Sequence, residues 1–90
     1  MKYFAAFLPM KDKELSDKYR QAHLDFLNKL KDEGTIPAYG RFVDGAGGLV
    51  IYKGESQEEV EELVKQDPFV AEGARDFEVH EWALVSDHWK

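Results

Sequence analysis

The sequence contains no cysteine. Disulfide bonds, thiolate nucleophiles and cysteine-ligated zinc or iron–sulfur sites are therefore excluded. Long apolar runs are also missing, since no stretch approaches the roughly 20 residues that a helix needs to span a bilayer. The first ten residues are too short and too aromatic for a secretory signal and lack a small-residue cleavage site. We therefore expect a cytoplasmic protein.

Basic residues are scarce relative to acidic ones. Twelve Lys and Arg stand against eighteen Asp and Glu, which gives a formal net charge of −6. Binding to nucleic acid depends mainly on neutralising phosphates with Lys and Arg. Anionic membrane surfaces attract the same side chains. The charge therefore argues against both nucleic acid and membrane surfaces as partners.

The length of the chain and its aromatic content indicate one small domain with a real core, spanning residues 1–90. The chain has 90 residues, and 13% of them are aromatic. At this size a protein buries only about 60–65% of its unfolded surface, so the stability of a single copy is modest. Association of copies is a plausible source of additional burial.

Apolar periodicity and turn residues divide the first half of the chain into four elements. Lys2–Leu8 is apolar at both odd and even positions, as in a strand covered on both faces, and the following proline ends it. Apolar residues at helical spacing predict a helix over Lys13–Glu33, closed by a glycine. Strands are predicted over Ile36–Val43 and Leu49–Tyr52, and the glycine-rich turn Asp44–Gly48 joins them into a hairpin.

The second half of the chain predicts one more helix and one more strand. Ser56 and Glu59 have the spacing of a capping box, which marks the start of the helix. Asp67-Pro68 ends it, because the residue before a proline disfavours the helical region. Phe69–Gly73 is then a connection, and Asp76–Val85 is the last strand.

The order β-α-β-β-α-β predicts an α+β, ferredoxin-like fold, with a four-stranded antiparallel sheet and two helices on one face. The strands are nevertheless apolar on both faces: Leu49 and Ile51 alternate with Val50 and Tyr52. A second apolar face left in water would form a large exposed patch. We therefore expect a homodimer of the dimeric α/β-barrel type, in which two copies pack sheet to sheet across an isologous interface.

A histidine interrupts the apolar face of the first predicted helix. His23 lies four residues after Tyr19 and four before Leu27, so it shares the buried stripe. One interpretation is a core histidine held by a single hydrogen bond. The other is a general acid or base, because partial burial beside a carboxylate suits an imidazole to proton transfer near neutral pH.

Asp67 is the candidate partner of this histidine. An acid in the last turn of a helix faces the negative end of the helix dipole, which costs a few tenths to about 1 kcal/mol. The structural interpretation is that Asp-Pro simply terminates the helix. The functional one is that Asp67 accepts a hydrogen bond from His23 and stabilises its protonated form, provided that the two helices bring them together.

Arg20 lies one helical turn before His23 and has two interpretations as well. It could bind an anionic group of a substrate. It could also pair with Asp17 or Asp25 at the surface, and its spacing from both acids favours this second interpretation.

No other pattern in the sequence carries a cofactor or metal. The glycines at 45–48 join two strands and lack the Lys-Ser/Thr and the helix of a phosphate-binding loop. His80 and His88 lie eight residues apart, with no set of carboxylates that would complete a metal site. Trp82 and Trp89 are expected to serve core and tail packing. We expect no cofactor and no metal.

Five short patterns occur in an order that resembles the YCII-related (YciI-like) family, and the resemblance covers nearly the whole chain. The patterns are Arg20-x-x-His23-Leu24-x-Phe26-Leu27, Gly40-x-Phe42-x-Asp44-Gly45-x-Gly47-Gly48, Ser56-x-Glu58-Glu59, Asp67-Pro68-Phe69-x-x-x-Gly73 and Glu78-Val79-x-x-Trp82.

The resemblance implies a ferredoxin-like fold, face-to-face dimers and an active site built on a His and an Asp, whose positions match His23 and Asp67. The family is similar to a dehydrochlorinase of a chlorinated hydroxyquinol, which implies lyase or isomerase chemistry. The chain departs from the family pattern at Arg41, where a proline is common, and this leaves the substrate open.

Two functions follow as hypotheses. The first is a cofactor-independent enzyme of lyase or isomerase type, with His23 as general acid/base and Asp67 as its orienting partner. The second is a non-catalytic dimeric module that binds a small ligand, since ferredoxin-like dimers have many functions. In either case we expect a small-molecule pocket with these residues: Arg20, Tyr39, Gly40, Phe42, Gly48 and Phe69.

Overall fold

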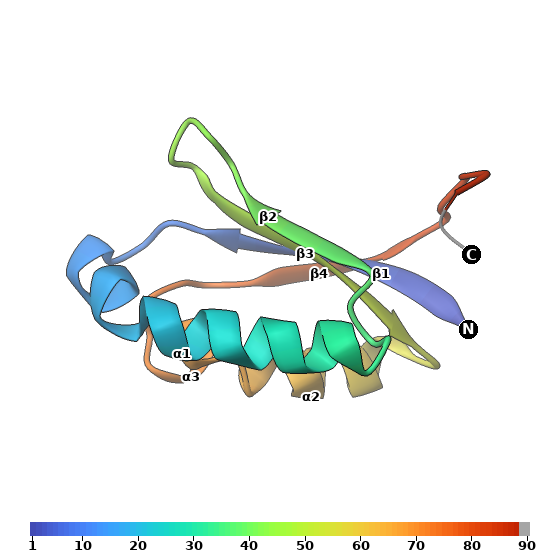
Figure 1. Ribbon diagram of the computed structural model, residues 1–90, viewed down its shortest axis with the longest axis horizontal. Helices are drawn as coiled ribbons and strands as arrows, with labels where there is room; N and C mark the ends of the chain where they lie inside the picture. The colour runs from blue at the N-terminus through green and yellow to red at the C-terminus, as the bar shows by residue number, and fades with distance from the viewer. Residues whose placement is uncertain (89–90) are drawn as a thin grey trace.

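The computed structural model describes residues 1–88, and seven helices and strands lie within that range (Figure 1). In chain order they are β1 (Lys2–Pro9), α1 (Lys13–Asp32), β2 (Ala38–Arg41), β3 (Gly47–Gly54), α2 (Gln57–Lys65), α3 (Pro68–Ala71) and β4 (Glu78–Trp82).

The four strands form one antiparallel sheet in the order β2-β3-β1-β4. The first and last strands of the chain are therefore neighbours, and the β2–β3 hairpin occupies the other edge. The helices lie on one face of this sheet (Figure 1). The predicted α+β, ferredoxin-like architecture is confirmed.

The long helix α1 is held at both ends by local chemistry. The Asp12 carboxylate caps its N-terminus by accepting a hydrogen bond from the Leu15 amide at 3.0 Å. Its C-cap is Glu33, and the chain then turns away at Gly34, whose φ of +86° suits a residue without Cβ. Leu27 and Leu30 on its inner face are buried against the sheet, and His23 shares this face.

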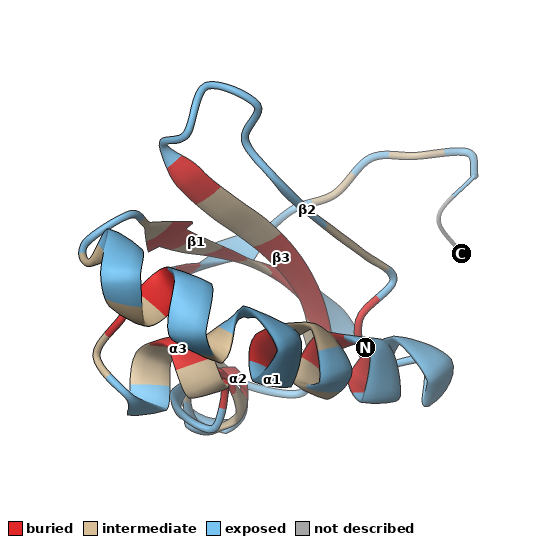
Figure 2. Cartoon of the chain, turned by 60° about the vertical axis from the view of Figure 1, so that its left-hand side comes forward, coloured by how far each residue is buried: buried red, intermediate tan, exposed pale blue. Residues whose placement is uncertain are grey.

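The core lies between the sheet and the helices. Alternate residues of β1 point toward the helices, opposite inward-facing residues of β3. Figure 2 shows that β3 carries buried and intermediate residues along its length, whereas the loop between β2 and β3 is exposed. The core is formed by Phe4, Ala6, Leu8, Leu27, Leu30, Ile36, Val50, Tyr52, Val60, Val64 and Val79.

Within residues 1–88 no helix covers the opposite face of the sheet, which is also apolar. Ala5 and Phe7 of β1 lie beside Ile51 and Leu49 of β3 on this face. Trp82 of β4, which we expected in the core, pairs with β1 on the same face and is 40% exposed. That expectation was wrong for a single copy, because the tryptophan lies on the side of the sheet away from the helices. Trp89 lies outside the described residues.

Three strand boundaries differ from those expected. β2 is shorter than Ile36–Val43, because Pro37 has no N–H to donate to a neighbouring strand. β3 is longer than Leu49–Tyr52, because the glycines that we assigned to the turn pair with the end of β1. β4 is shorter than Asp76–Val85, because its pairing with β1 stops where β1 begins.

The segment after α2 also differs from the prediction. α2 ends at Lys65, and Asp67 is the N-cap of a further short helix, α3, which begins at Pro68 and overlaps the predicted connection Phe69–Gly73. Pro68 takes the first helical position, where its missing N–H costs nothing. Asp67 therefore lies at the positive end of the α3 dipole, which favours a carboxylate. The expectation that Asp67 lies in the last turn of the preceding helix, facing its negative end, was wrong.

Gly47 is the glycine that this sheet depends on most. Its φ is +139°, and a Cβ added there would overlap the backbone oxygen of Leu8. We expect Gly47→Ala to lower the free energy of unfolding by about 3 kcal/mol or more, through backbone strain and overpacking together. Gly45→Ala is the control, because Gly45 has a φ of +84° but open space around it, and it should cost only about 1 kcal/mol. Urea denaturation checks both, and equal losses would contradict the role of the Leu8 contact.

Candidate active site

His23 and Asp67 meet beneath the helices, although 44 residues separate them in the chain. His23 Nδ1 lies 2.7 Å from Asp67 Oδ1. Asp67 is fully buried and His23 is 9% exposed. Two short-range features make the contact: the middle of α1 presents the imidazole inward, and the cap of α3 turns the carboxylate toward it.

The hydrogen bonds around Asp67 define which nitrogen of His23 is available. Asp67 Oδ1 accepts a second hydrogen bond, from the Phe69 amide at 2.9 Å. A carboxylate only accepts, so the proton in the His23–Asp67 contact belongs to His23 Nδ1. Nε2 of the neutral ring is then an acceptor with a free lone pair. This is the arrangement required of a general base oriented by a carboxylate.

Phe69 fixes the plane of the imidazole. The two rings are stacked, with centroids 3.8 Å apart and planes 8° from parallel. Phe69 is itself buried. The cap at Asp67 and the stack at Phe69 come from neighbouring positions of the same short helix, so α3 controls both the direction and the tilt of His23.

A cavity of about 470 Å³ opens beside His23. This volume lies within the range of small-ligand sites. The structure places seven of the eight predicted site residues on its wall. Asp67 is not on the wall and lies behind His23. The seven residues are Arg20, His23, Tyr39, Gly40, Phe42, Gly48 and Phe69.

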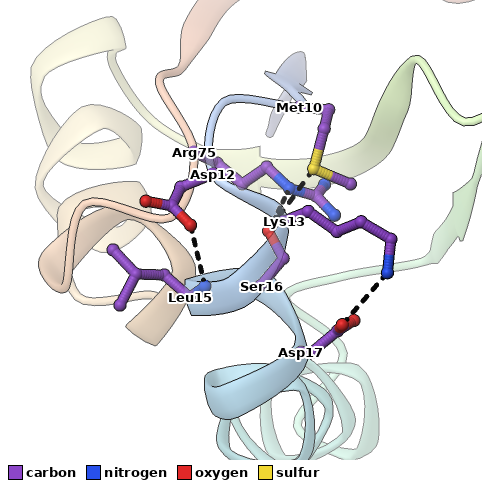
Figure 3. Close-up of polar contacts among 7 residues, drawn as sticks. All are labelled: Met10, Asp12, Lys13, Leu15, Ser16, Asp17 and Arg75. Carbon is purple, nitrogen blue, oxygen red and sulfur yellow. Dashed lines mark hydrogen bonds and ion pairs between the residues drawn. The ribbon is translucent and has the colours of Figure 1, made fainter.

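The most important wall residues that the sequence analysis missed are Ser16 and Arg75. Arg75 Nε donates to Ser16 Oγ at 3.1 Å, and Arg75 Nη1 lies 3.3 Å from the carbonyl oxygen of Leu8. Figure 3 shows Ser16 joined by dashed lines to both Arg75 and Met10, whose sulfur lies 3.5 Å from Ser16 Oγ. Ser16 could have been found, since it precedes His23 by two helical turns. No local signal marked Arg75.

A second buried polar group lies close to the His–Asp pair. Tyr52 is 1% exposed, and neither its hydroxyl nor Asp67 Oδ2 has a hydrogen-bond partner among residues 1–88. Burial raises the pKa of Tyr52, and the negative charge of Asp67 raises it further. Tyr52 therefore stays neutral well into the alkaline range while the protein is folded.

The described part of the chain offers no group of three or more His, Cys, Asp or Glu side chains that could hold a metal ion. Within the same residues no helix is both long and apolar enough to cross a membrane.

The raised pKa of Tyr52 predicts a loss of stability at high pH. Since the folded-state pKa lies above the ordinary value of 10.0, the folded protein holds the proton more tightly than the unfolded chain above that pH. The free energy of unfolding should be unaffected by this group below about pH 10 and should fall above it by up to about 1.4 kcal/mol per pH unit. Urea titrations at rising pH check this. Tyr52→Phe should reduce the slope, and the control Tyr19→Phe should not. An unchanged slope in Tyr52→Phe would contradict the prediction.

Comparison with known proteins agrees with the fold and with the resemblance noted in the sequence. The uncharacterized protein YjpA of Bacillus subtilis (strain 168) is 30% identical over 82 residues, which cover 91% of this chain and 96% of that protein. The structure of TftG, the 5-chloro-2-hydroxyhydroquinone dehydrochlorinase of Burkholderia phenoliruptrix AC1100 in complex with 2,5-dihydroxybenzoquinone, is similar with a TM-score of 0.75. It is 26% identical, and the match covers 89% of this chain and 92% of that one. Residues 1–83 match the YCII-related domain, and the chain therefore belongs to the YCII-related family.

Proposed function

We propose that this protein is a cofactor-independent enzyme of lyase or isomerase type, acting on a small molecule by proton transfer through His23. The observation that carries the proposal is the hydrogen bond between His23 and the fully buried Asp67, at the wall of a cavity of about 470 Å³. A packing histidine needs a partner but no adjoining cavity, whereas a general base needs both.

In the proposed reaction, His23 Nε2 takes a proton from an activated carbon or hydroxyl of the bound substrate. The resulting imidazolium is stabilised by the Asp67 carboxylate, which acts as the positioning residue and keeps its own charge. The electron pair left on the substrate either expels a leaving group such as chloride, which is an elimination, or moves within the molecule. In the second case His23 returns the proton to a different atom, which is an isomerisation.

The structural neighbour supports a small ring as the substrate. TftG is a dehydrochlorinase of a chlorinated hydroxyhydroquinone, and its structure holds a dihydroxybenzoquinone. A cavity of about 470 Å³ has room for a single substituted ring. Tyr39, Phe42 and Phe69 provide apolar wall area for such a ring. The wall position of Arg20 suits contact with a polar substituent.

The second candidate is a small-ligand-binding module without catalysis, and the same cavity favours it. Binding needs the shape and polarity of the cavity but not a basic imidazole. The two candidates therefore differ in what happens to a bound ligand when His23 loses its basicity.

Replacement of His23 tests the proposed reaction. Wild type should eliminate chloride from chlorinated hydroxyquinols, or exchange protons of ring ketones and lactones with D2O, and His23→Gln should lower kcat about 10²- to 10⁴-fold. Chloride release and NMR of the substrate are the measurements. His88→Gln is the control, since His88 is exposed and outside the cavity lining.

Equal turnover by wild type and His23→Gln would contradict the proposed role of His23. Binding by both proteins with turnover by neither would favour the non-catalytic module. Asp67→Asn gives a further comparison, since it removes the charge that stabilises the imidazolium and should lower kcat with little change in KM.

We also propose that the protein is a homodimer that covers the open face of the sheet with the same face of a second copy. Support comes from the partly exposed apolar residues gathered there: Ala5, Phe7, Leu49 and Trp82. A twofold, isologous contact of two such sheets removes the patch from water in both copies.

The cytoplasmic location of the protein stays a prediction, which cell fractionation checks.

Sedimentation at micromolar concentration tests the dimer. Wild type should sediment as a dimer, and Leu49→Lys should sediment as a monomer, because a charge in the centre of the face would be buried without a partner. Lys65→Leu is a control on the far side of the molecule, in the last turn of α2, and should leave the dimer intact. A stable wild-type monomer would rule out the proposal.

A further inference from the structure

Arg75 is held in place from several sides at the wall of the cavity. Its backbone amide donates to the carbonyl of Phe69 at 2.9 Å, and its guanidinium carbon lies 4.5 Å from the centroid of the Phe69 ring. Nε is bonded to Ser16 on α1 and Nη1 to the carbonyl of Leu8 on β1. A long, flexible side chain is thus restricted to one orientation beside His23.

The positive charge of Arg75 has no direct counter-ion within residues 1–88. None of the ion pairs in this part of the chain includes it. Two of its five N–H donors are used in the bonds to Ser16 and Leu8, and the other three have no acceptor among residues 1–88. Burial lowers the pKa of Arg75, and the charge of Asp67 opposes that change. The Asp67 carboxylate is already bonded to His23.

The cavity is cationic although the protein is acidic. Four cationic side chains line it, against the single acid Asp17, in a chain with a net charge of −6. Lys13 is paired with Asp17 at 3.1 Å. Arg20 and Arg41 are exposed at the wall, whereas Arg75 is partly buried and fixed. A low-dielectric wall strengthens the attraction between such a fixed cation and an anion.

We propose that Arg75 is the specificity-determining anchor of the cavity, binding an ionised oxygen of a single-ring substrate while His23 acts at another atom of the same molecule. This inference rests on the proposed function for the role of His23. The ionised oxygen belongs to a carboxylate or to a phenolate, and both offer the lone pairs that a guanidinium binds at two points. Substrates whose oxygens are all neutral form only the weaker, uncharged hydrogen bonds with these donors, so the cavity favours anions over neutral analogues.

Ligand charge separates this role from a purely structural one. If Arg75 only ties β1 to α1, an uncharged ligand should bind as well as its anionic counterpart. If Arg75 anchors an anion, binding should follow the charge of the ligand and the charge of residue 75 together.

Dissociation constants for matched probe pairs, measured by ligand-observed NMR, test the proposal. The probes are benzoate with benzamide for the carboxylate arm, and 4-nitrophenolate with its methyl ether for the phenolate arm. In wild type at least one anion should bind on the order of tenfold more tightly than its neutral partner. The arm with the larger preference identifies the substrate class.

Variants assign the preference to residue 75. Arg75→Gln should bind both members of the preferred pair equally, and Arg75→Lys should keep part of the preference, since it keeps the charge but not the two-point contact. Arg41→Gln is the matched control and should keep most of the preference, because Arg41 lines the same cavity but is exposed and has no side-chain partner that fixes it in the described part of the chain. Thermal melts verify that each variant is folded. If Arg75→Gln does not fold, Arg75→Lys and the wild-type probe pairs still test whether Arg75 is responsible for the preference for anions.

Two outcomes overturn the inference: no preference for either anion in wild type, or an undiminished preference in a folded Arg75→Gln. Its failure is distinguishable from failure of the proposed function when binding is repeated in His23→Gln. That variant should keep the anion preference of wild type even though it has lost turnover. Preference for anions without any turnover would retain Arg75 as the anchor and remove His23 as the catalyst.

Discussion

The rest of the site depends on the burial of one carboxylate. Asp67 lies entirely out of water, and an isolated charge there would be strongly unfavourable. Two hydrogen bonds to Oδ1 offset that cost: one from the first turn of α3 and one from His23. The same oxygen thus begins a helix and orients an imidazole, so the local fold and the candidate chemistry cannot be separated.

Around this carboxylate the structure combines an apolar sheet with a polar rim. Phe69 stacks on the imidazole of His23 and also contacts the guanidinium of Arg75, so one aromatic ring positions both polar groups. The β1–β3 pairing supplies the floor of the cavity, and the glycines at the start of β3 let the strands approach closely there. A ligand in this cavity would meet the imidazole of His23, the fixed guanidinium of Arg75 and further cationic side chains beside apolar wall residues.

Much of the architecture was predictable, because it depends on short-range rules. Apolar runs bounded by turn residues located the strands, helical periodicity located the two longer helices, and the order of elements led to the ferredoxin-like sheet. The predicted strand boundaries were wrong where pairing with a neighbouring strand determines how far a strand extends. The strands extend only as far as their neighbours do, as at the ends of β3 and β4. The second predicted helix was expected to end at Asp67-Pro68, and α2 ends just before them, at Lys65. A further helix begins at Pro68 because the Asp67 side chain caps it by accepting from the Phe69 amide.

By itself the sequence determined that His23 shares the apolar face of a helix and that no cysteine chemistry is available, because both follow from residue type and periodicity. The resemblance of its short patterns to the YCII-related family added the expectation that His23 and Asp67 act together. Only the tertiary structure decided that they meet, at 2.7 Å across 44 residues, and that Ser16 and Leu8 hold Arg75 beside them. Contacts of this kind join segments far apart in the chain, and their geometry is set by how the helices pack on the sheet, which no local pattern encodes.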